Sequence, residues 1–95
     1  MAQPTRTSLH HVLSSIDDPR LMQAFLTDIL TPDEKEEIER RWQIVQRLAA
    51  GEPQRSIAKD LGIGIATVTR GARELYDKKG GFWRVLNSYQ RIKKL

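Results

Sequence analysis

The side chains with the clearest chemical potential lie in the short segment IATVT. Thr67 and Thr69 carry hydroxyl groups that can hydrogen-bond to a base or to a phosphate, and Ile65 or Ala66 can contact the methyl group of a thymine. Arg55, which precedes this segment, can reach a guanine or a phosphate. Small and methyl-bearing residues at the start of a helix are typical of proteins that read the major groove of DNA.

Residues 54–73 match the pattern of a helix-turn-helix. Two crossing helices need apolar or small residues at fixed offsets, and the turn between them needs a residue that tolerates a positive φ angle. Gly62 is that turn residue. The other positions of the pattern are Ile57, Ala58, Leu61, Ile63 and Val68. The pattern therefore predicts two short helices that hold residues 65–70 against the major groove.

Charge is distributed unevenly along a chain whose net charge is +4. Residues 1–52 carry 6 basic and 9 acidic side chains, whereas residues 53–95 carry 10 basic and 3 acidic side chains. A basic half is a candidate footprint for a polyanion, although a solvated basic face is an equally simple explanation. The side chains expected on the phosphate backbone are Lys59, Arg73, Lys78 and Lys79.

Gly71 lies inside the second helix of this pattern, where glycine costs about 1 kcal/mol relative to alanine. The pattern usually has an apolar core residue at this position. One explanation is close contact between two helices, and the other is a slot for a flat ligand. Arg41 on the preceding long helix and Arg70 can face each other across such a slot, because guanidinium planes stack on aromatic faces. The spacing alone does not choose between these explanations.

The remaining periodicity is helical throughout, without an alternating strand pattern. We expect an all-α fold of about six helices in one domain over residues 1–95, and such a short chain often dimerises. Thr31 and Glu34 predict a capping box at the start of the long helix, and Gly51 predicts its end. The expected segments are dimerisation helices within 8–50 (helices 8–16, 19–29 and 31–50), a helix-turn-helix over 54–76 (helices 54–60 and 65–76) and a C-terminal helix over 82–92.

Several classes of function are excluded by composition. The chain has no cysteine, so it has no disulfide framework or thiolate metal site, and the adjacent pair His10 and His11 lacks further ligands. The acids of residues 33–39 lie at a helix start, where carboxylates stabilise the helix dipole, so we expect no enzyme activity. No apolar run approaches the roughly 20 residues of a membrane helix, and no secretion signal precedes the first helix. We therefore expect a cytoplasmic protein without a metal.

The stretches LTPDEKEEIERRWQIVQRL and AAGEPQRSIAKDLGIGIATVTRGARELY closely resemble the tryptophan repressor family of the bacterial trp operon. The resemblance covers residues 28–76, and LTPDE and LGIGIATVTRG are its most specific parts. It implies an intertwined homodimer of six helices per chain. It also implies that L-tryptophan acts as the corepressor and lies between the long helix and the recognition helix. No cofactor is expected. The bound ligand would tilt the recognition helices toward successive major grooves of a palindromic operator.

The resemblance also implies a role for individual residues. Arg41 and Arg70 would sandwich the indole, and Gly71 would leave room for the edge of the ring. Thr31 and Arg70 would meet the carboxylate, while main-chain carbonyls near Leu30 would accept from the ammonium. The remaining residues of the implied ligand site are Val45, Thr67 and Glu74. The residues expected to face DNA are Arg55, Lys59, Gly64, Ile65, Ala66, Thr67, Thr69, Arg70 and Arg73.

Three departures from the family pattern bear on these roles. The stretch GEPQRS is one residue shorter than the usual pattern before the helix-turn-helix. Glu74 stands where the family typically has a serine near the amino group of the ligand, so its carboxylate can pair with the ammonium or crowd the site. Ala58 stands where a lysine commonly contacts the operator, so the preferred DNA sequence is expected to differ.

Together these features predict a tryptophan-responsive repressor that binds operator DNA as a homodimer and exerts negative feedback on tryptophan synthesis. Two alternatives stay open. The first is a ligand-independent helix-turn-helix regulator of the same family. The second is a helical module that docks an acidic protein through its basic half, which would show no preference for a DNA sequence.

Overall fold

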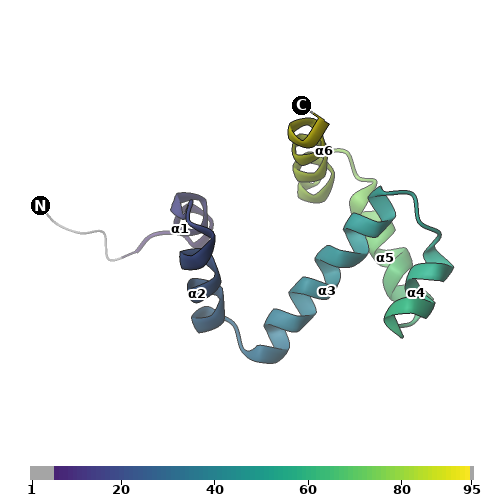
Figure 1. Ribbon diagram of the computed structural model, residues 1–95, viewed down its shortest axis with the longest axis horizontal. Helices are drawn as coiled ribbons and strands as arrows, with labels where there is room; N and C mark the ends of the chain where they lie inside the picture. Colours follow the sequence, from purple (N-terminus) through teal and green to yellow (C-terminus); the bar gives the residue numbers. More distant parts are fainter. Residues whose placement is uncertain (1–5, 95) are drawn as a thin grey trace, which may run out of the picture. The chain divides into compact units, whose positions relative to one another are not determined.

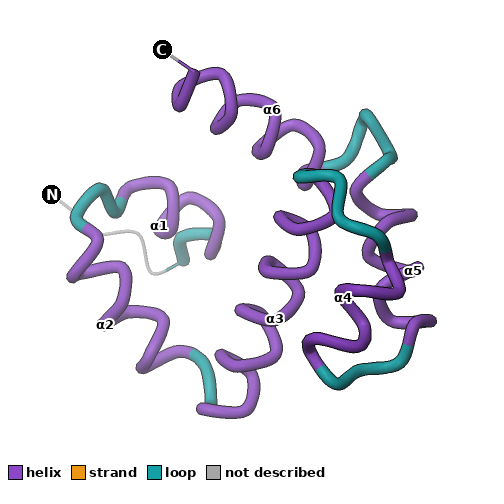
Figure 2. Tube along the Cα trace, turned by 45° about the vertical axis from the view of Figure 1, so that its right-hand side comes forward, coloured by secondary structure: helices purple, strands orange, loops and turns teal. Residues whose placement is uncertain are grey.

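A computed structural model describes residues 6–94, with side chains up to residue 88. Within this range the chain forms helices only, and no strand is present (Figures 1 and 2). The helices are α1 (Leu9–Ser15), α2 (Pro19–Ile29), α3 (Pro32–Ala49), α4 (Gln54–Leu61), α5 (Ile65–Leu75) and α6 (Gly81–Lys94). The predicted all-α fold class is therefore confirmed, and each expected helix is present with small differences at its ends.

The chain divides into two compact units, Met1–Glu37 and Ile38–Leu95. The division falls within α3, so that α1 and α2 belong to the first unit and α4, α5 and α6 to the second. The expected organisation of residues 1–95 as one domain stays a prediction. The helix-turn-helix lies wholly within the second unit.

Local signals set the helix starts of the first unit. Asp18 caps α2, where its carboxylate accepts a hydrogen bond from the backbone N–H of Arg20 at 3.0 Å. At the start of α3, the backbone N–H of Thr31 donates to Glu34 at 2.9 Å, and the N–H of Glu34 donates to the Thr31 hydroxyl at 3.2 Å. This reciprocal pair is the predicted capping box. The hydrogen bonds from Thr31, first through its backbone and then through its side chain, lower the pKa of Glu34 because they stabilise its charged form.

Neither α1 nor α2 contains a buried residue. Some of their apolar side chains are partly buried, whereas Leu9, Leu21 and Ile29 are 53%, 56% and 48% exposed. Burying apolar surface stabilises a protein by about 25 cal/mol per Å², and surface left in water does not contribute this stabilisation. Contiguous exposed apolar surface is typical of an interaction face. The first unit therefore presents apolar surface that this single chain does not cover.

The second unit has one hydrophobic core to which all its helices contribute. Ile57 of α4 and Val68 of α5 are both 0% exposed, which confirms their predicted place in the helix-turn-helix pattern. Leu61 and Ile63 are partly buried against the same core. The buried residues of this core are Ile44, Val45, Leu48, Ile57, Ala58, Val68, Ala72, Leu75 and Leu86.

The turn between α4 and α5 depends on glycine. Gly62 has a φ angle of +67°, in the left-handed region that glycine adopts without steric cost. The backbone N–H of Ile63 donates to the carbonyl of Ala58 at 3.0 Å, and the N–H of Gly62 donates to that of Lys59 at 3.3 Å. These bonds end α4 and reverse the chain into α5, through the loop drawn between the two helices in Figure 2.

The burial of Ile57 predicts its contribution to stability. We expect Ile57→Ala to lower the free energy of unfolding by about 2–5 kcal/mol, because the truncation leaves a cavity between α4 and α5. Ile65→Ala is the matched control, since Ile65 is 50% exposed at the start of α5. It should change the free energy of unfolding by less than about 0.5 kcal/mol. Urea denaturation of both variants measures the difference, and equal losses would contradict the assigned core.

Candidate nucleic-acid interface and ligand site

The recognition helix α5 has one buried face and one exposed face. Val68 is 0% and Ala72 5% exposed, and both pack in the core. The opposite face points to solvent, and it carries the side chains that the sequence assigns to DNA. All of the expected DNA-facing residues are exposed, namely Arg55, Lys59, Gly64, Ile65, Ala66, Thr67, Thr69, Arg70 and Arg73. Their exposure is what contact with a groove requires, while each individual contact stays a prediction.

The N-terminus of α5 is open. Gly64 precedes the helix in an extended conformation, and no side chain caps the helix there. The backbone N–H of Thr67 donates to the carbonyl of Gly64 at 3.1 Å. The N–H groups that precede Thr67 in the first turn have no acceptor within the helix. Unsatisfied amides at a helix start, together with the helix dipole, favour a negatively charged group such as a phosphate.

The hydroxyl of Thr69 donates a hydrogen bond to the amide oxygen of Gln54 at 2.7 Å. Gln54 is the first residue of α4, so this bond joins the exposed face of α5 to the start of the other helix of the motif. Gln54 was not among the residues predicted from the sequence. No local signal marks it, because the partner lies 15 residues away in the chain.

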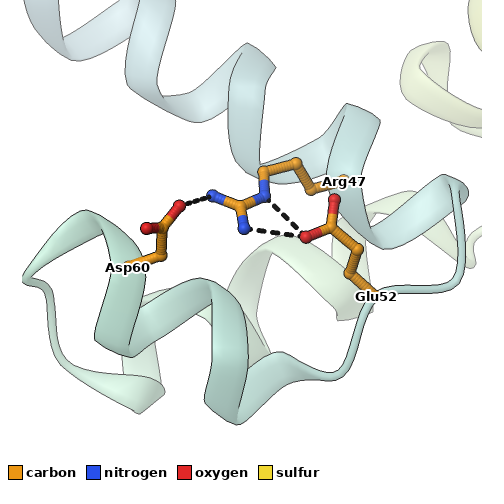
Figure 3. Close-up of polar contacts among 3 residues, drawn as sticks. All are labelled: Arg47, Glu52 and Asp60. Carbon is orange, nitrogen blue, oxygen red and sulfur yellow. Dashed lines mark hydrogen bonds and ion pairs between the residues drawn. The ribbon is translucent and has the colours of Figure 1, made fainter.

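Arg47 connects α3 with the following loop and with α4 (Figure 3). Its Nε and one terminal nitrogen donate to Glu52 at 2.9 and 2.7 Å, and its other terminal nitrogen donates to Asp60 at 2.6 Å. Hydrogen bonds to Glu52, and then to Asp60, raise the pKa of Arg47 above its ordinary value. We refer to these three residues as the Arg47 cluster. Sequence reasoning missed it, although Glu52 lies in the shortened stretch before the motif.

Gly71 marks a close approach between α5 and α3. A Cβ atom at this position would lie 3.1 Å from Cγ2 of Ile44 and 3.7 Å from Cδ1 of Leu48. The first distance is shorter than ordinary van der Waals contact, so any side chain here would displace Ile44. Helix packing is thus one observed reason for the glycine, and its role in a ligand slot stays a prediction.

Several predicted ligand residues of the second unit lie close to this contact in the sequence. Arg41 precedes Ile44 by three positions on α3 and therefore shares its face, and Arg70 directly precedes Gly71. Both arginines are exposed, as is Glu74 one turn after Gly71. Val45 is only 1% exposed and belongs to the core.

Two further predicted ligand residues, Leu30 and Thr31, belong to the first unit. Thr31 there serves the capping box of α3. Their contribution to a ligand site stays a prediction, as does that of Thr67.

The described residues contain no group of three or more histidine, aspartate or glutamate side chains that could hold a metal ion. None of the helices they form is long and apolar enough to cross a membrane. His10 and His11 form a pair with ring centroids 4.4 Å apart on the exposed surface of α1.

A helix-turn-helix with an exposed face on its second helix, in an all-helical chain, is typical of DNA-binding proteins. Comparison with known families gives a match over residues 6–90 to the family described as Trp repressor protein. The chain therefore belongs to the Trp repressor family, whose members are transcription regulators and not enzymes.

Curated relatives carry the name Trp operon repressor homolog. The protein of Vibrio campbellii is 44% identical over 68 residues, which cover 70% of this chain and 67% of the relative. That of Vibrio vulnificus is 53% identical over 51 residues, covering 53% of this chain and 50% of the relative. That of Vibrio cholerae is 50% identical over 54 residues, covering 56% and 52%. The match thus spans between half and two thirds of the relatives' length, and no solved structure matches the chain significantly.

The Arg47 cluster predicts a contribution of charge to stability. We expect Arg47→Met to lower the midpoint of thermal unfolding, because it removes the bonds that join α3 to α4 while keeping most of the side-chain stem. Added salt should shrink the difference from the unmodified protein, since salt screens exposed ion pairs. Arg55→Met is the matched control, because Arg55 is exposed and lies outside the cluster. Identical midpoints for the two variants at low salt would contradict the assigned role.

Proposed function

We propose that this protein is a tryptophan-responsive transcriptional repressor that binds a palindromic operator as a homodimer in the cytoplasm. The observation that carries the proposal is the arrangement of α5. Its exposed face carries most of the residues expected to face DNA, and its buried face meets α3 at Gly71. Arg70 precedes Gly71 in the sequence, and Arg41 lies about one turn from Ile44 on α3. Membership of the Trp repressor family supports both halves of the proposal.

Residues 65–70 of α5 enter the major groove. Thr67 and Thr69 read base edges, and Ile65 or Ala66 contacts thymine methyl groups. Arg55 reaches a guanine or a phosphate from the start of α4. Further side chains that bind the phosphate backbone are Lys59 and Arg73, and they account for affinity rather than for sequence preference.

Tryptophan binds where α3 and α5 approach each other. Its indole lies between the guanidinium groups of Arg41 and Arg70, next to Gly71, and its ammonium pairs with Glu74. Because the same helix presents the DNA-facing residues, a ligand at this contact changes the orientation of the recognition face. The ligand favours the DNA-binding conformation only by its higher affinity for that conformation.

A second copy of the chain covers the apolar side chains of α1 and α2. These helices contain no buried residue in the single chain, and Leu9, Leu21 and Ile29 are each about half exposed. A two-fold dimer presents two recognition helices, so the operator has matching two-fold symmetry. The repressor thereby gives negative feedback on tryptophan synthesis.

One observation favours a second candidate, a ligand-independent regulator of the same family. The contact of Gly71 with Ile44 explains the glycine without any ligand. The two candidates differ in whether DNA binding depends on tryptophan.

Selection from a pool of randomised DNA duplexes, with and without L-tryptophan, separates these candidates. We expect a two-fold symmetric sequence to be enriched only when tryptophan is present. Affinity for that sequence should fall with salt with a log–log slope of about −0.9 per phosphate neutralised. Equal enrichment without tryptophan would identify a ligand-independent regulator. Enrichment of no sequence under either condition would contradict DNA readout and favour a protein-docking module.

A pair of variants separates the packing role of Gly71 from its ligand role. We expect Gly71→Ala to bind tryptophan roughly tenfold more weakly, about 1.4 kcal/mol, because the added methyl group enters the slot. Ile44→Leu removes the methyl branch that lies 3.1 Å from the added Cβ, so the double variant should regain the stability lost through that contact. Calorimetric titration and urea denaturation measure the two properties.

The double variant is decisive because it restores packing without emptying the slot. It should stay defective in tryptophan binding, while Ile44→Leu alone should bind normally. Recovery of both stability and tryptophan affinity in the double variant would show that Gly71 serves packing alone.

A further inference from the structure

Two polar side chains meet on the exposed side of the helix-turn-helix. The Thr69 hydroxyl donates to the Gln54 amide oxygen at 2.7 Å, a typical length for a well-formed O–H···O hydrogen bond. Thr69 is exposed on α5, and Gln54 is half-buried at the start of α4. Among the described residues, neither side chain makes a hydrogen bond to any other.

This bond fixes what Thr69 can offer to DNA. A hydroxyl group has one proton to donate and two lone pairs that accept. The proton is engaged by Gln54, so only the lone pairs remain for a ligand. The amide nitrogen of Gln54 in turn keeps both its protons for an acceptor outside the protein.

The major groove presents both kinds of partner. Phosphate oxygens, guanine N7 and O6, and thymine O4 only accept hydrogen bonds, so a Thr69 hydroxyl engaged with Gln54 cannot bond to them. The exocyclic amino groups of adenine N6 and cytosine N4 donate, and they complement its lone pairs.

We propose that Gln54 is a specificity-determining positioning residue, which holds Thr69 as a hydrogen-bond acceptor for the amino group of an adenine or cytosine. Its own amide nitrogen donates to a nearby phosphate, which accepts. This inference rests on the proposed DNA-binding function and adds the base class that one position of the operator carries.

The surrounding structure keeps the pair in register. Ile57 of α4 and Val68 of α5, both 0% exposed, pack in the same core and fix the two helices against each other. Thr67, by contrast, is exposed on the same helix and bonds through its side chain to no other described residue. Its hydroxyl can donate or accept, so Thr67 provides a matched comparison.

The test is selection from a randomised duplex pool by the full chain in the presence of L-tryptophan. The unmodified protein should enrich adenine or cytosine at one position of each half-site. Gln54→Met and Thr69→Val should each reduce that preference by about two- to tenfold at the same position, the range expected for one hydrogen bond. The double variant should lose no more than either single variant. Thr67→Val should affect a different position and combine additively with Gln54→Met.

Conservative variants distinguish this role from a structural one. Gln54→Glu, whose carboxylate only accepts, should keep the adenine or cytosine preference while overall affinity falls, because a negative charge then lies near the phosphates. Thr69→Ser should also keep the preference.

The results that would overturn the role of Gln54 differ from those that would overturn the proposed DNA-binding function. The inference is overturned if Gln54→Met weakens binding equally at all positions or alters a position other than that of Thr69. Loss of the preference in Gln54→Glu would also overturn it. If the unmodified protein enriches no sequence, the proposed function fails and this inference fails with it.

Discussion

The approach of α5 to α3 at Gly71 is the constraint on which the rest of the second unit depends. Ile44 lies so close to the glycine that even one methyl group at residue 71 would push against it. The backbone of α5 at Gly71 therefore packs against the side chain of Ile44 on α3. The buried residues of the core lie around this contact. Because α5 also carries the exposed recognition face, the spacing of this one contact determines how that face is presented.

Two other features act on the same motif. The left-handed turn at Gly62 and the buried pair Ile57 and Val68 join α4 to α5, whereas Arg47 joins α4 to α3 through Asp60. A ligand that separates α3 from α5 at Gly71 must therefore act against connections that hold α4 in place.

Features determined by neighbouring residues could be predicted from the sequence. The capping box of Thr31 and Glu34, the turn at Gly62 and the helix boundaries all follow from local rules. Bonds between residues that are not close neighbours in the sequence could not be predicted in this way. For this reason neither the Arg47 cluster nor the pair of Gln54 and Thr69 was expected. At Gly71 the sequence left two explanations, and only coordinates could show the neighbouring Ile44. Arg41 and Arg70 were proposed from the residues around Gly71, whereas the other ligand residues came only from the family resemblance.

The exposed apolar side chains of α1 and α2 affect how the stability of the protein depends on its concentration. These helices have no buried residue in one chain, and in the proposed dimer a second copy covers their exposed apolar side chains. Folding of this segment and pairing of chains are then a single equilibrium, which shifts with the amount of protein present. Dilution alone would loosen the amino-terminal half of the molecule while leaving the helix-turn-helix with its own enclosed core.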